Sequence, residues 1–435
     1  TRPSVTQLIT VLIDIISIIT PHGSPCILKG MKVVAILGRQ PELSLAELEQ
    51  RFGGGSVRPY SDLSAIVETD GFDVQTLGGT MKAGRVIAEL GTAAWDRLSR
   101  DIVQRYAREL KGDGKLTLGI SVYGRDVPAR DVQRTGLALK QMLKKQGRSV
   151  RLIPNDGPVL STATSHHNKL GLSDNKLELM VVYGTESVLV AESVGTQNIT
   201  ALAARDQVRP KTDAFVGMLP PKLALMMINL SGITAGLQAS SPSNDDDVRE
   251  DERETAGTVL DPFCGTGVVL QEAALLGYDV YGTDLAEKMV DYSKANLEWL
   301  ANKRPIGSVR VEAGDAIEHV WQPPISAVVA ETYLGQPFSA PPAPDKLDKV
   351  RRVVEQIVTR FLQNIHGQLE PGTPLCLAVP AWRDARGWFT FLDVIKNVES
   401  LGYEWQELEH ADVRKLTYYR EDQVVARQLL ILTRK

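Results

Sequence analysis

The stretch TVLDPFCGTGVVLQEAALLGYDVYGTD, residues 258–284, decides the fold. Its apolar beginning predicts a strand, its middle a helix, and DVYGTD a second strand. Strands and helices keep alternating toward the C-terminus, with a further helix expected at 388–401 and a hairpin at the end. This alternation predicts an α/β, Rossmann-like domain over 258–435, whose parallel sheet is doubly wound and closed by an antiparallel strand.

Each of the first three predicted strands ends at or near an aspartate: Asp261, Asp284 and Asp315. Open sheets bind ligands outside the carboxyl ends of their strands. Asp284 follows Asp261 by 23 residues, where an acid can accept hydrogen bonds from both ribose hydroxyls. Asp315 can accept one from an adenine amine. Three acids at successive strand ends therefore predict a nucleoside site.

The loop between the first strand and its helix favours one kind of nucleoside. Gly265 and Gly267 allow the backbone to approach a ligand closely. The G-x-G-x-x-G pattern of pyrophosphate sites is absent here. Asp261 would repel a phosphate but attract a cationic methionine amine, which favours S-adenosylmethionine over a dinucleotide. A G-x-G alone is an ordinary turn, so the prediction depends on the two later acids.

Composition excludes several classes of protein. The chain has 435 residues, which suggests two to four domains, and 43% of them are hydrophobic. That argues against a disordered, collagen-like or membrane-spanning protein. Three cysteines exclude a disulfide scaffold and suit a reducing compartment, so we expect a cytoplasmic protein. The net charge of −4 hides an acidic run at 245–254, with seven acids against two arginines, and a basic region at 111–170, with eleven Lys or Arg against four Asp.

The first 30 residues differ from the rest of the chain. Their apolar run, 8–19, is shorter than a membrane span and contains an aspartate. We expect an upstream extension that is not part of the core, with a membrane anchor or an added strand or helix as alternatives. The other expected divisions are an α+β domain at 31–110, a strand-rich domain at 111–206, a connecting helical segment at 207–233 and an acidic flexible linker at 234–257.

Several motifs resemble a known family. DPFCGTG, YGTD, GMLPPKLALMMINLS and LGGTMKAGRV look like the THUMP-containing tRNA guanosine-10 N2-methyltransferases and their bacterial relatives, which are class I S-adenosylmethionine-dependent enzymes. The resemblance implies a seven-stranded methyltransferase domain, with a THUMP-like RNA-binding module at 111–206. It implies tRNA processing as the role, S-adenosylmethionine as the cofactor and tRNA as the partner. The implied cofactor-binding residues are Asp261, Pro262, Phe263, Cys264, Gly265, Gly267, Asp284, Asp315 and, in a supporting segment, Met218.

The same resemblance locates the catalytic position after the fourth strand. Amino-methyltransferases carry Asp or Asn, two prolines and an aromatic residue there, but this chain has Glu331-Thr332-Tyr333-Leu334. In one interpretation Glu331 and the carbonyl of Thr332 accept from the amine while Tyr333 stacks on the base. In the other, the longer acid misplaces the carboxylate and activity is lost, since about 1 Å of misplacement can cost on the order of a hundredfold.

Two other features have plain interpretations. Cys264 lies inside the glycine loop without a neighbouring histidine in the sequence, so we interpret it as a small packing residue. His166 and His167 are adjacent and have no Cys or Asp cluster near them, so no metal site is expected.

Basic residues concentrate in the second expected domain. They suit a sequence-independent contact with RNA phosphates, although a solvated helix face is the alternative. Low aromatic content there favours recognition by shape. We expect a tRNA methyltransferase acting on an exocyclic amine, with guanine N2 favoured. The alternatives are a DNA amino-methyltransferase and a non-catalytic RNA-binding protein; a small partner subunit stays open. The expected RNA-binding residues are Arg125, Arg130, Arg134, Lys140, Lys144 and Lys145.

Overall fold

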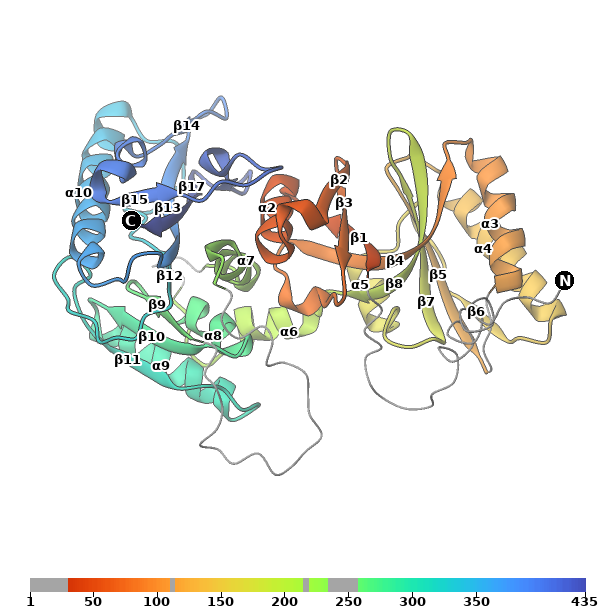
Figure 1. Cartoon of the computed structure of the whole chain (residues 1–435), viewed down its shortest axis with the longest axis horizontal. Coiled ribbons are helices and arrows are strands. Elements are labelled where there is room, and N and C mark those ends of the chain that lie inside the picture. The colour runs from red at the N-terminus through yellow and green to blue at the C-terminus, as the bar shows by residue number, and fades with distance from the viewer. Residues whose placement is uncertain (1–29, 110–113, 214–218, 234–256) are drawn as a thin grey trace, which may run out of the picture.

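Two β-sheets organise the chain, and helices α2 and α7 lie between them (Figure 1). The computed structural model describes residues 30–109, 114–213, 219–233 and 257–435. The expected extension at 1–30 and the expected linker at 234–257 therefore fall almost wholly outside the described residues. No helix within these ranges is long and apolar enough to cross a membrane.

The first sheet has eight strands and joins both of the expected N-terminal domains. Pairing is antiparallel except where β5 pairs with β6 and β7. In spatial order the strands are β2 (Val57–Ser61), β3 (Ser64–Thr69), β1 (Met31–Leu37), β4 (Thr80–Gly91), β8 (Ser187–Thr196), β7 (Lys176–Tyr183), β5 (Leu116–Tyr123) and β6 (Val150–Leu152). The helices of this part are α2 (Pro41–Phe52), α3 (Trp95–Glu109), α4 (Ala129–Lys145), α5 (Thr162–His167) and α6 (Ile199–Ala203). Because β4 pairs with both β1 and β8, one ladder runs across the predicted division at residue 110, which stays a prediction.

The second sheet has nine strands and forms the C-terminal part. Parallel strands β11, β10, β9, β12 and β13 are followed by β17, which is antiparallel to β13, and by β15, which is antiparallel to β17. Their bounds are β9 (Thr258–Asp261), β10 (Asp279–Asp284), β11 (Val309–Ala313), β12 (Ala327–Glu331), β13 (Pro374–Arg383), β14 (Phe389–Thr390), β15 (Tyr403–Trp405), β16 (Thr417–Tyr418) and β17 (Val425–Arg434). The α/β, doubly wound fold predicted from the alternation is confirmed.

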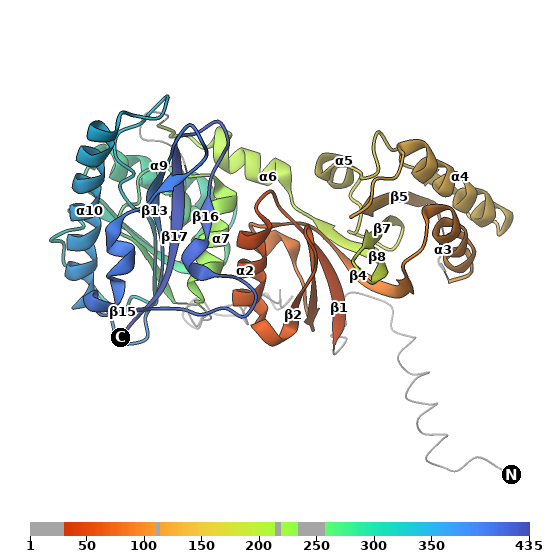
Figure 2. The ribbon, with the colours of Figure 1, turned by 90° about the horizontal axis from the view of Figure 1, so that it is seen from above.

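Helices cover both faces of this second sheet. The helices are α7 (Pro221–Ser231), α8 (Val268–Leu275), α9 (Glu287–Ala301) and α10 (Pro344–His366). In both views α10 lies on the side opposite α7 (Figures 1 and 2). Pro221 and Pro344 occupy the first turns of α7 and α10, where proline costs no hydrogen bond. The buried side chains of the two faces form one continuous apolar core.

Helix α2 attaches the first sheet to the second part. Its Glu47 is fully buried and accepts hydrogen bonds from the backbone of Gly78 and Gly79, at 2.7 Å each, and from the Asn229 amide of α7, also at 2.7 Å. A Cβ on Gly78 would lie 2.8 Å from the backbone N of Met226 in α7. This docking joins the two parts of the molecule along the side of the second sheet.

One local expectation is wrong, and one apolar side chain of α4 is exposed. The helix expected at 388–401 is replaced by β14 and two short 3₁₀ segments, because Phe389 and Thr390 pair with β13 instead. In α4, Leu137 is 45% exposed although its apolar character favours burial. It lies two residues from Leu139, and therefore about 200° around the axis from the buried face.

Candidate active site

The glycine loop between β9 and α8 has the backbone that a close ligand contact requires. Gly265 and Gly267 have φ of +50° and +79°, in the left-handed region that favours glycine. A Cβ on Gly267 would lie 2.9 Å from the Ser293 hydroxyl, so that side is filled. A Cβ on Gly265 would meet only the Phe263 carbonyl oxygen, at 3.9 Å, within 4 Å. The backbone of Gly265 thus borders open space where a ligand can approach.

Asp284 organises this loop from the neighbouring strand. One carboxylate oxygen accepts from the backbone N of Gly265 and the other from that of Ala286, at 2.9 Å each. Burial raises the pKa of the Asp284 carboxyl, partly offset by these two hydrogen bonds. Each oxygen keeps a second acceptor direction, so the same carboxylate can also accept from ribose hydroxyls.

Asp261 ends β9 and lies opposite Gly282 of β10, two residues before Asp284. It is 2% exposed, and one of its oxygens accepts from the backbone N of Phe263 at 3.1 Å. Burial raises the pKa of this carboxyl well above its usual value, and the nearby charges of Asp284 and Glu331 raise it further. A cation bound next to Asp261 would favour the charged form of this carboxyl and lower its pKa again.

The third predicted acid, Asp315, lies two residues beyond the end of β11. It is half-buried and accepts from the backbone N of Ile317 at 3.1 Å. The backbone N of Gly314 donates to the Asp284 carbonyl oxygen at 3.0 Å, which ties this turn to the end of β10. The structure therefore brings the three predicted acids to neighbouring strand ends of one sheet.

The predicted catalytic segment follows β12. Glu331 forms an ion pair with the Nε of Arg427 on β17, and both side chains are largely buried. Thr332 is buried and donates its backbone N–H to the Ala378 carbonyl oxygen at 3.0 Å. Tyr333 is 46% exposed, so its ring is accessible to an incoming base. The sequence analysis missed Arg427, whose one local signal is a basic residue next to a run of four apolar residues separated from it only by Gln428.

The remaining loop residues have mainly packing roles. Phe263 packs edge-on against Phe361 of α10, with ring centroids 5.1 Å apart, and Pro262 is buried. Cys264 is buried in the core, and burial raises the pKa of its thiol well above the usual value, which disfavours a thiolate nucleophile. In the described ranges no cluster of three or more His, Cys, Asp and Glu could hold a metal ion. Met218 lies outside the described residues.

Asn296 of α9 is a second residue that the sequence analysis missed. Its side-chain N donates to the carbonyl oxygens of Thr266 at 2.8 Å and Lys211 at 2.9 Å, and its oxygen accepts from the Lys211 backbone N at 2.9 Å. One buried amide thus fastens the segment that precedes α7 to the glycine loop. Nothing in the local sequence around Asn296 predicts this contact across 85 residues.

The six expected RNA-binding residues lie far from this site. Five of them belong to α4, at the opposite end of the molecule from the second sheet (Figure 1). Arg130 and Arg134 face Asp131, at 3.9 and 3.2 Å, and the Arg125 guanidinium lies 5.2 Å from the centre of the Tyr183 ring. Most of the six side chains remain exposed, and their contact with RNA stays a prediction.

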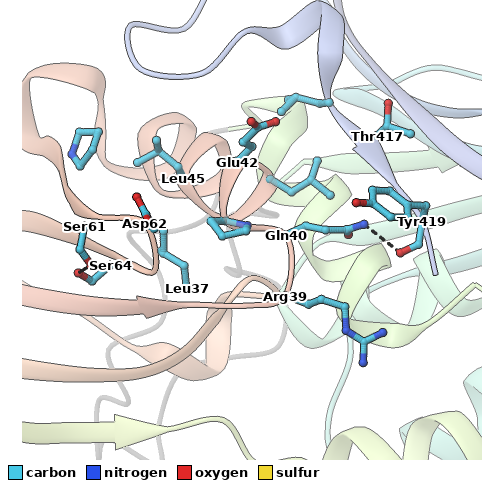
Figure 3. Close-up of a pocket in the computed structure, with 14 residues that line it drawn as sticks. Leu37, Arg39, Gln40, Glu42, Leu45, Ser61, Asp62, Ser64, Thr417 and Tyr419 are labelled. Atoms are coloured by element: carbon cyan, nitrogen blue, oxygen red, sulfur yellow. Dashed lines mark hydrogen bonds between the residues drawn. The ribbon is translucent and has the colours of Figure 1, made fainter. Parts of the chain in front are cut away.

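A cavity of about 510 Å³ lies between the two parts of the molecule (Figure 3). The first part supplies Gln40, Glu42 and Asp62, and the second supplies Thr417 and Tyr419. The Gln40 amide donates to the Tyr419 carbonyl oxygen at 2.9 Å. None of the predicted cofactor or catalytic residues lines this cavity.

The second sheet defines the class of the C-terminal part. Without the short strands β14 and β16, the strands from β9 to β17 are numbered one to seven along the chain. Their order across the sheet is then 3-2-1-4-5-7-6, and the seventh strand, β17, is antiparallel to the fifth, β13. With acids at the first three strand ends, this is the Rossmann-like fold of class I S-adenosylmethionine-dependent methyltransferases.

Comparison with curated proteins adds a more specific similarity. A segment of 181 residues is 32% identical to the tRNA (guanine(10)-N2)-dimethyltransferase of Methanothermobacter thermautotrophicus, covering 41% of this chain and 44% of that protein. The equivalent protein of Pyrococcus abyssi is 29% identical over 208 residues, 47% and 50% of the two chains. The predicted resemblance to this group is thereby confirmed, while its THUMP component stays a prediction. The chain spans about half the length of the curated relatives it matches.

Solved structures similar to this chain share little sequence with it. TrmN from Thermus thermophilus is 18% identical, with a TM-score of 0.48 and coverage of 93% of this chain and 100% of that one. The putative methyltransferase SMU.472, solved with SAH, is 12% identical with a TM-score of 0.45, covering 92% and 98%. No family model matches the chain.

Proposed function

We propose that this protein transfers a methyl group from S-adenosylmethionine to an exocyclic base amine of tRNA, with guanine N2 as the target. The observation that carries the proposal is that Asp261, Asp284 and Glu331 end three neighbouring strands, and that Asp284 accepts from the backbone N of Gly265, which borders open space. The names of the curated relatives support the tRNA substrate and the guanine amine. A cytoplasmic place of action would follow from that substrate.

The cofactor fits the donor set at this edge. Asp284 would accept from the ribose hydroxyls, Asp315 from the adenine amine, and Asp261 would attract the methionine ammonium. S-adenosylmethionine supplies an activated methyl on its sulfonium, so no metal is needed and alignment is the main task of the protein. The carboxylates also suit the cofactor's positive charge, which is lost on transfer.

Glu331 and Tyr333 would act on the base. The amine lone pair is conjugated into the ring, so the amine becomes nucleophilic only when its protons are held by acceptors. Glu331 would accept one N–H and the Thr332 carbonyl another, while Tyr333 stacks on the base. The cofactor would supply the methyl group and keep the C–S electron pair as a neutral thioether, and Glu331 would accept the proton that the methylated amine loses.

Arg427 would determine the direction of the Glu331 carboxylate. Its guanidinium grips one carboxylate oxygen, so only the other is available to the substrate amine. This is how a glutamate could serve where related motifs carry a shorter acid. In the alternative interpretation the site is inactive, because the same ion pair holds the Glu331 carboxylate away from the substrate amine.

Labelled methyl transfer distinguishes these alternatives. Purified protein with tritiated S-adenosylmethionine and bulk tRNA should label tRNA, and mass spectrometry of the nucleosides should show methylated guanosine. Glu331→Ala should abolish transfer while calorimetry still shows cofactor binding. The exposed acid Glu287 at the start of α9 provides the matched control, Glu287→Gln, which should label tRNA normally. Cofactor binding with no transfer to tRNA or duplex DNA would contradict the proposal.

A further inference from the structure

Two β-hairpins project beyond the strand ends that carry the candidate active site. In the register of β12 and β13, Glu331 lies opposite Ala378, and β13 continues five residues further to Arg383. At about 3.3 Å per residue, Arg383 lies about 16 Å past the level of Glu331. The turn between β13 and β14 projects from the C-terminal part of the molecule (Figure 1). Beside it, Tyr419 follows β16, whose partner strand β17 also pairs with β13.

Aromatic side chains gather on these hairpins. Trp388 is 73% exposed and Phe391 is 39% exposed. Ring centroids of Phe389 and Phe391 are 6.0 Å apart, and those of Phe389 and Tyr419 are 5.5 Å apart. We name these three rings, together with the exposed Trp388 that directly precedes Phe389 in the turn, the aromatic platform. Tyr419 also lines the cavity between the two parts, so the platform continues into it (Figure 3).

The platform is held in place without being covered. At its root Trp382 is buried and belongs to the core. In the turn, one Asp384 carboxylate oxygen accepts from the backbone N of Arg386 at 2.9 Å and of Trp388 at 2.8 Å. The turn is therefore preformed and keeps Trp388 in solvent. Large exposed aromatic side chains on a rigid turn indicate a surface that binds a partner.

The charges on the hairpins indicate what that partner is. The Arg383 guanidinium lies 5.5 Å from the centre of the Tyr419 ring and donates to the Glu421 carbonyl oxygen at 3.2 Å. Arg420 faces Asp422 at 3.6 Å. In the described residues neither Arg383 nor Arg386 forms an ion pair with a carboxylate. Exposed rings beside unneutralised guanidinium groups suit unpaired nucleotides, whose bases stack and whose phosphates need cations.

We propose that the aromatic platform binds unpaired nucleotides of the RNA substrate that flank the methylated base. The inference rests on the proposed function, because it uses the position of the platform above Glu331. It supplies what the basic helix α4 lacks, which is recognition of bases close to the site of methyl transfer. A base in a duplex presents no free face for stacking, so single-stranded RNA is the preferred ligand.

Binding of short RNA tests the platform independently of methyl transfer. The probe is a fluorescein-labelled, unstructured ten-nucleotide oligouridine, compared with a duplex RNA of the same length at one salt concentration. The full chain should bind the single strand more tightly. Trp388→Ala and Phe391→Ala should each weaken this binding about fivefold or more, since one stacked base contributes roughly 1–3 kcal/mol. Trp388→Phe should restore most of the affinity.

A matched control uses an exposed apolar residue elsewhere. Val353 on α10 is 52% exposed, and Val353→Ala should bind RNA like the parent. Calorimetry with S-adenosylmethionine should be unchanged in every variant, which shows that the fold is intact. Parental oligouridine affinity in both Trp388→Ala and Phe391→Ala overturns the inference. If the parent binds oligouridine through the platform but transfers no methyl group to tRNA, the proposed function is contradicted and the inference about the platform stands.

Discussion

Arg427 on β17 reaches across β13 to form an ion pair with Glu331 at the end of β12. The two residues are 96 positions apart in the chain. Strand β13 lies between β12 and β17. On it, Glu331 pairs with Ala378 and Arg427 pairs with Pro380, only two residues further along, so the two side chains can meet across the strand. The candidate catalytic carboxylate is thus oriented by a residue of the last strand in the chain.

Replacing this arginine should affect catalysis more than cofactor binding. In Arg427→Ala the Glu331 carboxylate is released, and a shift of about 1 Å should lower kcat on the order of a hundredfold. Calorimetry should show an unchanged affinity for S-adenosylmethionine. Loss of one partner of a buried pair should also reduce the free energy of unfolding by roughly 3–5 kcal/mol, measured in urea.

The exposed pair of Arg414 and Glu407 provides the control for that experiment. Arg414→Ala should change the free energy of unfolding by less than about 1 kcal/mol and leave kcat intact. A parental kcat in Arg427→Ala would show that the ion pair does not orient Glu331 for catalysis.

Asp284 should be the strongest single determinant of cofactor affinity. Asp284→Ala removes the acceptor for the backbone of Gly265 and Ala286 as well as the proposed ribose contact. Loss of one or two charge-assisted hydrogen bonds to the ribose should weaken binding at least about tenfold, since each contributes roughly 1.5–3 kcal/mol. Titration calorimetry measures this directly, with the neighbouring exposed Glu287→Gln as reference. An unchanged dissociation constant would exclude Asp284 from the cofactor site.

Docking of the N-terminal sheet should depend on Gly78. In Gly78→Ala the added methyl would approach the Met226 backbone N of α7 to 2.8 Å, which is closer than real contacts allow. The strain should cost about 1–3 kcal/mol and loosen the two parts, so limited proteolysis near the connection should accelerate. Gly55→Ala has no atom within 4 Å of the new Cβ and should behave like the parent. Equal proteolysis in both variants would contradict the role of Gly78.

The buried carboxyl of Glu47 should make stability depend on pH. Burial raises its pKa from 4.5 to about 6, against the opposing effect of its hydrogen bonds. The folded state therefore binds this proton more tightly than the unfolded state, and the resulting stabilisation is present below pH 4.5. It disappears as the pH rises through 6, a change of about 2 kcal/mol.

Comparison with Glu47→Gln isolates this contribution from the other buried acids. The difference in free energy of unfolding between parent and variant should favour the parent more at pH 4.5 than at pH 7. Urea titrations at several pH values measure it. A pH-independent difference would mean that Glu47 keeps its ordinary pKa in the folded protein.

Local patterns in the sequence were sufficient for much of the fold and of the cofactor site. Apolar runs separated by helical segments predicted the order of β9 to β13, and each predicted acid lies at or just beyond its strand end. The backbone conformation of a glycine turn and the end of a strand are set by residues close in the chain. Their positions can therefore be predicted from the sequence alone. The error at 388–401 arose because strand pairing with β13 overrode local helical character.

The sequence by itself determined the sheet class, the glycine loop and the trio of acids, because these depend on short-range periodicity and backbone preference. Only the tertiary structure decided that Arg427 grips Glu331, that α2 docks on α7 through Glu47 and Gly78, and that the strands at 31–196 form one sheet. Those contacts join residues tens to hundreds of positions apart. Their geometry is set by which strands and helices pack together, and no local pattern encodes it.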